Sequence, residues 1–132
     1  MRFTERELTL ALQGAAKSLL SVQDKSVRKR QRTVDEAWES LTKYQRFQLL
    51  DGLGDQLLPV LVALPDVEVA VGTRPTFTDA EIKAVVEQHA GAEGRGLKGK
   101  VLVGARTALV KAALEHVPPR QDPDALIVPD HL

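Results

Sequence analysis

The chain has 132 residues, of which 43% are hydrophobic, and 18 Lys and Arg balance 18 Asp and Glu, so the formal net charge is zero. This length and composition suit one domain with a hydrophobic core and exclude wholesale disorder, while the balanced charge excludes a general electrostatic attraction to nucleic acid or anionic membrane. The chain has no cysteine, which excludes disulfides, thiolate nucleophiles and cysteine-bound metals.

The first predicted helix covers about 5–21 and begins with the Thr-x-x-Glu pattern of a capping box, formed by Thr4 and Glu7. Thr78 and Glu81 repeat this pattern, and a phenylalanine precedes the threonine in both copies. The sequences that follow, TLALQGAAKSLL and AVVEQHAGAEGR, share few positions, whereas a duplicated domain would keep its core pattern. The repeat therefore indicates two helix starts and no duplication.

The polar segment 22–32 is rich in Lys and Arg, and its sequence does not distinguish a helix from a connector. A second helix is predicted to begin near Thr33, where Glu36 gives a weaker capping box. Apolar residues then continue at spacings of three or four to position 64. We therefore expect one long helix over 33–64, bent between Gly52 and Pro59, or two nearly collinear helices.

The segment after this helix alternates valine with other residues at positions 67–71, which is the period of a half-exposed strand. The other candidate strand is ALIV at 125–128, so a minor two-stranded β pairing between these segments is a secondary expectation.

Two more helices are predicted, from Thr78 to His89 and over 100–116, joined by a glycine-rich link at 91–100. His89 falls on the apolar face of the first, which predicts a histidine in the core. The apolar spacing of the second predicts an inward-facing row at Leu102, Ala105, Leu109 and Ala112.

These patterns predict a mainly α-helical fold, a compact bundle of four to five helices that forms one domain over 1–117. Residues 118–132 hold four of the seven prolines and are predicted to form an extended C-terminal arm that packs on this domain or on a partner chain.

No motif indicates catalysis, a cofactor or a metal. The loop 94–101 matches G-x-x-x-x-G-K, but a helical pattern precedes it and Val101 stands where a magnesium-binding hydroxyl is needed. The three histidines, His89, His116 and His131, have no partner at metal-binding spacing. We therefore expect no catalytic residue, no cofactor and no metal site.

Two basic stretches without acidic residues, 25–32 and 95–111, are candidate contacts for nucleic acid or another anion. Their candidate residues are Arg28, Lys29, Arg30, Arg32, Lys98 and Lys100. Binding of nucleic acid would require the two stretches to converge on one surface.

A second set of residues is a candidate association surface, because small side chains in a row allow close approach of another backbone and an apolar tail can lie in a groove. These residues are Gly104, Ala108, Ala112, Leu126, Ile127 and Val128. The same residues would serve equally well to complete the core of a monomer.

The first twenty residues lack the apolar core of a signal peptide, and the longest apolar run, 57–64, is too short to cross a bilayer. We therefore expect a cytoplasmic protein with no membrane partner. The main functional hypothesis is a non-enzymatic module for protein interaction or self-association, such as a homodimer. The alternatives are a nucleic-acid-binding regulator and an enzyme whose pocket is not visible in the sequence.

Overall fold

The computed structural model describes residues 1–121, in which helices follow one another without a β-strand. The mainly helical fold predicted from the sequence is confirmed. In chain order the elements are α1 (Glu5–Gln23), α2 (Lys25–Arg28), α3 (Val34–Ser40), α4 (Lys43–Ala63), α5 (Asp79–Ala90), the 3₁₀ turn η1 (Gly91–Gly94) and α6 (Gly96–Glu115).

Four of the helices begin with a capping box, and three of these boxes are the ones predicted from the sequence. The Thr78 backbone N–H donates to Glu81 at 2.9 Å and the Glu81 N–H donates to the Thr78 hydroxyl at 3.1 Å. The bond that the Thr78 backbone N–H donates to the Glu81 carboxylate holds the pKa of this carboxyl below its usual range. The box that sequence reasoning missed is Thr42 with Gln45, at the start of α4.

The predicted helix over 33–64 is interrupted elsewhere than expected. The break lies at Leu41 and Thr42, where Leu41 is extended and the Thr42 side chain caps α4. Helix α4 then continues through Pro59 to Ala63. A strong local cap therefore decides where the helix stops and restarts, although the apolar spacing continues across the break.

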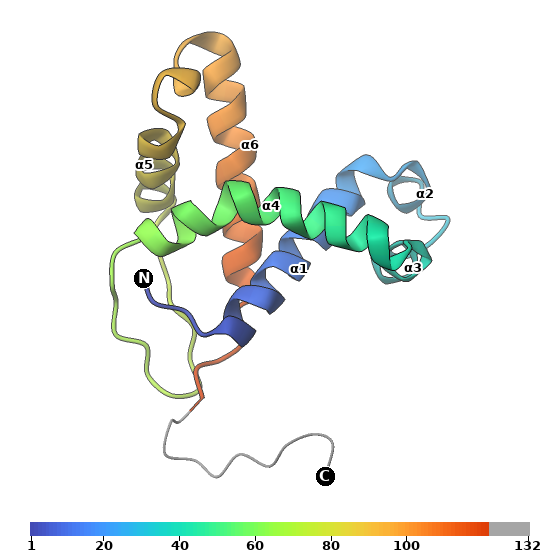
Figure 1. Ribbon diagram of the computed structural model, residues 1–132, viewed down its shortest axis with the longest axis horizontal. Helices are drawn as coiled ribbons and strands as arrows, with labels where there is room; N and C mark the ends of the chain where they lie inside the picture. Colours follow the sequence, from blue (N-terminus) through green and yellow to red (C-terminus); the bar gives the residue numbers. More distant parts are fainter. Residues whose placement is uncertain (122–132) are drawn as a thin grey trace.

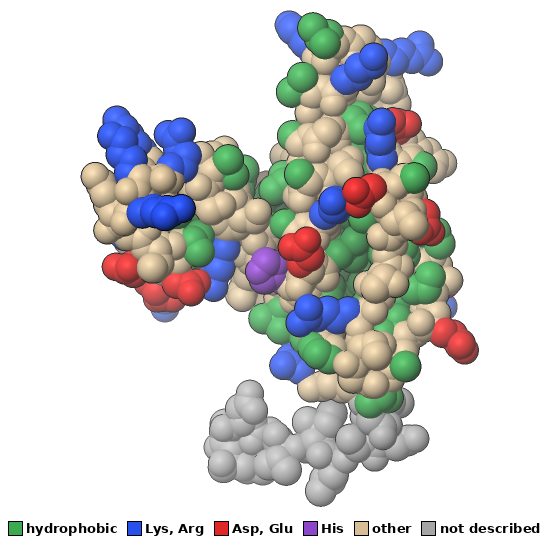
Figure 2. Space-filling view, turned by 180° about the vertical axis from the view of Figure 1, so that it is seen from behind, with side chains coloured by type: hydrophobic (Ala, Val, Ile, Leu, Met, Phe, Trp, Pro, Cys, Tyr) green, Lys and Arg blue, Asp and Glu red, His purple; other side chains and the backbone are tan. Residues whose placement is uncertain are grey.

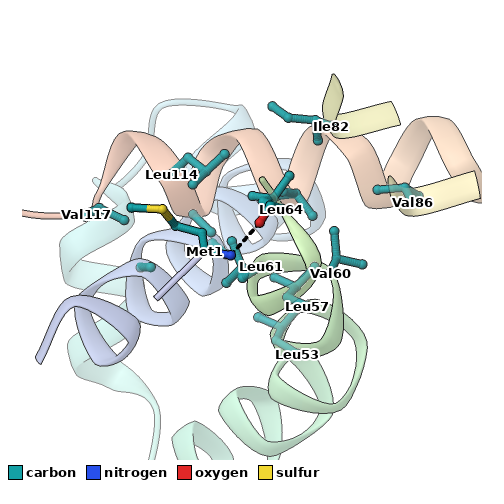
Figure 3. Packing of buried hydrophobic residues seen from close by; sticks show 14 of the residues in the cluster. Met1, Leu53, Leu57, Val60, Leu61, Leu64, Ile82, Val86, Leu114 and Val117 are labelled. Atoms are coloured by element: carbon teal, nitrogen blue, oxygen red, sulfur yellow. Dashed lines mark hydrogen bonds between the residues drawn. The ribbon is translucent and has the colours of Figure 1, made fainter. Parts of the chain in front are cut away.

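The core lies where α4 crosses α1 and α6 (Figure 1). Side chains from these helices and from α5 interlock there, including Leu57, Val60 and Leu61 of α4 (Figure 3). Met1 packs among them, and its ammonium group donates to the carbonyl oxygens of Val62, at 2.8 Å, and Leu64. Met1 thus provides hydrogen-bond donors for two carbonyl groups at the C-terminal end of α4.

Two arms extend from this crossing (Figure 1). The α2–α3 arm comprises residues 24–42, and the α5–α6 arm comprises α5, η1 and the first half of α6. At the crossing itself α1 approaches α6 closely, because a Cβ atom on Gly14 would lie only 2.1 Å from Cγ of His116. Gly14 therefore leaves room for the imidazole ring.

The inward-facing row predicted for the last helix is wrong. The buried residues of α6 are Gly99, Val103, Val110, Ala113 and Leu114, whereas Ala105 is exposed and Leu102, Leu109 and Ala112 are half-buried. Helix α6 is apolar on nearly every side, so the spacing of its apolar residues did not indicate which side packs. It also begins at Gly96, inside the predicted glycine-rich link.

The segment 67–71, predicted to form a strand, has no regular secondary structure. The two residues that follow it, Gly72 and Thr73, form backbone hydrogen bonds with Arg120 at the start of the C-terminal arm. The Gly72 N–H donates to the Arg120 carbonyl at 2.8 Å, and the Arg120 N–H donates to the Thr73 carbonyl at 2.7 Å. Arg120 also donates to the buried carboxylate of Glu7 at 3.1 Å. The suggested partner strand, 125–128, lies outside the described residues.

Candidate functional site

One side of α6 presents apolar side chains to solvent. Leu97 is 81% exposed and Val101 is 68% exposed. Small residues that are exposed or half-buried follow on the same side, about two to four turns after Leu97. Together with Leu97 and Val101 they form one row at helical spacing. We call this row the outer face of α6; it consists of Leu97, Val101, Gly104, Ala105, Ala108 and Ala112.

The outer face lies on the side of α6 opposite to its buried residues, which include Val103 and Val110. Figure 2, which shows the molecule from behind, displays hydrophobic side chains on the surface of the α5–α6 arm. A Cβ atom on Gly104 would meet nothing within 4 Å, whereas one on Gly99 would lie 2.2 Å from the backbone of Gly94. Within the described chain, close packing of α6 therefore uses Gly99, and Gly104 stays open to solvent.

Cations flank the outer face near the start of α6. Lys98 and Lys100 are both exposed, on either side of the row, and neither forms an ion pair with a residue in 1–121. Further along the helix, Lys111 is paired with Asp79 of α5 at 3.0 Å. The outer face is thus an apolar row with free positive charge at its N-terminal end.

A second exposed face occurs on α4 and has the opposite charge. Tyr44 is 68% exposed and Phe47 is 63% exposed. Asp51 and Asp55 continue the same side of the helix, are exposed, and pair with no cation among the described residues. We call Tyr44, Phe47, Asp51 and Asp55 the α4 face; its aromatic residues belong to the apolar spacing noted over 33–64.

The basic stretch 25–32 forms α2 and a turn at the end of the α2–α3 arm. Arg28, Lys29 and Arg30, which we call the basic turn, are all exposed, and Arg30 has a left-handed backbone with φ of 57°. Arg32 points toward the start of α2, where its guanidinium forms an ion pair with Asp24 at 2.7 Å. Arg32 is therefore a structural residue, while the other three cations face solvent.

Bonds from the Ser26 hydroxyl and the Arg32 guanidinium lower the pKa of the Asp24 carboxyl to about 2. The same aspartate accepts from the backbone N–H of Ser26 at 2.9 Å and so caps α2. This network, which we call the Asp24 clasp, holds the basic turn in one conformation.

The basic turn and the cations of α6 lie on different arms. Figure 2 shows Lys and Arg side chains at the end of each arm, with the open space between the arms separating the two groups. The single basic surface that nucleic-acid binding was expected to require is therefore not formed by these two stretches within one described chain.

The histidines contribute no shared site in the described residues. His89 is exposed, contrary to the core position predicted for it, and its Nδ1 lies 3.1 Å from the carbonyl of Val85 in its own helix. His116 bonds in the same way to Ala112 at 2.8 Å. Within residues 1–121 no group of three His, Asp or Glu side chains is placed to hold a metal ion.

A polar groove lies beside His116, between α1 and α3. Its lining includes Lys17 and Asp35, which pair with each other at 3.0 Å. This groove therefore places the His116 imidazole beside the ion pair of Lys17 and Asp35.

The association residues suggested in the tail, Leu126, Ile127 and Val128, lie outside the described residues. No helix in the described part of the chain combines the length and the apolar character needed to cross a membrane. Comparison of the chain with protein-family models, with curated proteins and with solved structures gives no match.

Proposed function

We propose that this protein is a self-association module, and that the outer face of α6 is the surface on which a second copy docks. The observation that supports this proposal is the exposure of Leu97 and Val101 on a helix that has small residues in place of charges along the rest of the same side. Large apolar side chains that stand together on an exposed helix face commonly mark a surface on which another protein packs.

The charge around this surface favours a second copy as its occupant. Lys98 and Lys100 flank the outer face, so a partner of complementary charge must present acidic side chains around an apolar centre. Another copy of the chain presents such a surface, because Asp51 and Asp55 are exposed on the same side of α4 as Tyr44 and Phe47.

The test is the solution mass of the protein, measured by light scattering or sedimentation equilibrium over a wide range of concentration. We expect the wild-type mass to rise above that of a single chain as concentration increases. Ala108→Glu places a charge at the centre of the outer face, on an exposed position that tolerates Glu in a helix, and is expected to keep the mass of a single chain.

Ala84→Glu is the matched control, because Ala84 is an exposed helical alanine on α5 away from the outer face. This control should associate as the wild type does. A folded wild-type protein that keeps the mass of one chain at every concentration would contradict the proposal, as would equal association of the Ala108→Glu variant.

The two basic stretches share no surface within residues 1–121, so the hypothesis that uses both is dropped. The basic turn by itself supports a narrower second candidate function, the binding of nucleic-acid phosphates at the end of the α2–α3 arm. It presents three consecutive exposed cations on a turn fixed by the bond from the Gln31 N–H to the Ser26 carbonyl, at 2.8 Å. We expect R28Q/K29Q to weaken binding to a short DNA duplex, with wild-type affinity falling steeply as salt is raised. R6Q/K43Q removes the same charge elsewhere; equal binding by both variants would contradict this function.

A further inference from the structure

We propose that the surface docked on the outer face of α6 is the α4 face of the next copy, so that the protein assembles head to tail. This inference rests on the proposed function, because it names the partner surface for the same docking site. The inference depends on the complementarity of two exposed faces. The α4 face has aromatic and acidic side chains, and the outer face of α6 has small side chains flanked by cations.

The α4 face has the side chains that typically anchor a protein interface. Tyr44 and Phe47 are large, exposed and adjacent on one side of a helix. Next to them, Arg46 lies over the Trp38 ring at 5.6 Å and donates to the Trp38 carbonyl at 3.1 Å. The start of α4 is thereby fixed against α3, so little ordering is needed when the aromatic pair docks.

The outer face of α6 has the complementary shape. Gly104 has open space where its side chain would be, and Ala105 and Ala108 are exposed. Small residues in a row leave a shallow channel on a helix, into which aromatic side chains of another helix can pack. No residue among 1–121 fills this channel above Gly104.

The order of these features along the two helices fixes their relative direction. On α4 the aromatic pair precedes Asp51 and Asp55 by about two helical turns. On α6 the cations Lys98 and Lys100 precede the small residues by about two turns as well. An antiparallel arrangement therefore places aromatic side chains over small ones and, in the same register, carboxylates beside ammonium groups. A parallel arrangement would match neither pair.

The two faces point away from each other within one molecule. The buried side of α4, which includes Leu53 and Leu57, packs toward the crossing, and its exposed side points outward. The outer face of α6 lies opposite the buried residues of that helix, which include Val103 and Val110. A contact between different faces leaves one of each free after every step, so the assembly grows beyond two chains, into a ring or an open filament.

A charge-swap experiment on the full chain tests this pairing, with the concentration dependence of mass as the readout. The α4 variant D51K/D55K and the α6 variant K98E/K100E each place like charges across the proposed contact. We expect each variant alone to lose the increase in mass that the wild type shows. Mixing the two in equal amounts should restore association, because each interface then joins opposite charges.

Combining all four substitutions in one chain should also restore association, since the swapped faces again match. The control E5K/E68K makes the same change in net charge as D51K/D55K at exposed positions outside both faces, and should associate as the wild type does. F47A should lose association without any change in charge. Circular dichroism on every variant establishes that the fold is intact.

The outcomes separate this inference from the function on which it rests. If A108E abolishes association while D51K/D55K and F47A leave it unchanged, the outer face of α6 docks a surface other than the α4 face, and the head-to-tail pairing is overturned. If the wild-type mass saturates at two chains, a closed dimer replaces the larger head-to-tail assembly and the pairing is again overturned. If the wild type does not associate at all, the proposed function is overturned as well.

Discussion

The crossing of α1, α4 and α6 and the α2–α3 arm are stabilised by different forces. The crossing buries large aliphatic side chains, and α1 and α6 approach closely there because His116 packs directly over Gly14. The arm buries little besides Ala37 and Trp38, and polar contacts of Asp24 and Arg46 hold its turns in place. We therefore expect the crossing to respond to changes in volume and the arm to respond to pH and to the loss of single polar groups.

Truncation of a core leucine should have the largest effect. Leu57 is fully buried at the crossing, and Leu57→Ala is expected to lower the free energy of unfolding by about 2–5 kcal/mol through lost burial and a cavity. Urea denaturation followed by circular dichroism measures this change. The half-buried neighbour Leu58 is the control, and an equal loss for Leu58→Ala would contradict the assignment of the core.

Overpacking the same crossing should have the next largest effect. A Cβ on Gly14 would lie 2.3 Å from Cβ of His116, so Gly14→Ala forces α1 and α6 apart and should cost about 1–3 kcal/mol. Gly52→Ala is the matched substitution in α4, where nothing lies within 4 Å, and it should stabilise the fold by about 0.5–1 kcal/mol. Opposite signs in thermal denaturation confirm the close approach; equal signs would refute it.

Loss of one cation should weaken the arm without unfolding the crossing. Arg46 donates to the carbonyls of Trp38, at 3.1 Å, and Glu39, at 3.0 Å, and stacks on the Trp38 ring. Arg46→Ala should therefore destabilise the arm by about 1 kcal/mol. Because Trp38 is the single tryptophan, its fluorescence reports this region directly. Lys43→Ala is the control, and it should leave the emission spectrum unchanged.

Acid should loosen the arm through Asp24, with the smallest effect of the four. The pKa of Asp24 is about 2 in the fold against an ordinary value of 3.8, so the unfolded arm takes up the proton first. Asp24 therefore stabilises the arm above about pH 4, and this contribution is lost as pH falls toward 2. The fluorescence of Trp38 should follow that loss in the wild type. Asp24→Asn should remove the transition and Asp51→Asn should keep it; an unchanged profile for Asp24→Asn would contradict the clasp.

The helix starts were predictable because a capping box is complete within four residues of sequence. Thr4, Thr33 and Thr78 were recognised in this way, and the same signature was present at Thr42 with Gln45. Recognition of that fourth box would have located the break between α3 and α4. The continuous apolar spacing obscured it, because leucines at helical intervals do not record a change in helix direction.

The candidate surface was predictable only in part. The small residues Gly104, Ala108 and Ala112 follow a helical row that can be read from the sequence, but their exposure depends on which side of α6 the other helices cover. The sequence does not encode that choice in its periodicity, because α6 has apolar residues on nearly every side. The exposure of Tyr44 and Phe47 likewise depends on how α4 lies across the crossing.

By itself, the sequence determined the helical class, the starts of α1, α3 and α5 and the position of the basic stretches, because these depend on neighbours within a turn or two of the chain. The tertiary structure alone decided which side of each helix is buried, that the basic turn and the cations of α6 lie on different arms, and that Arg120 pairs with Glu7. These features join residues far apart in the chain, and their geometry is set by the packing of whole helices rather than by local hydrogen bonds.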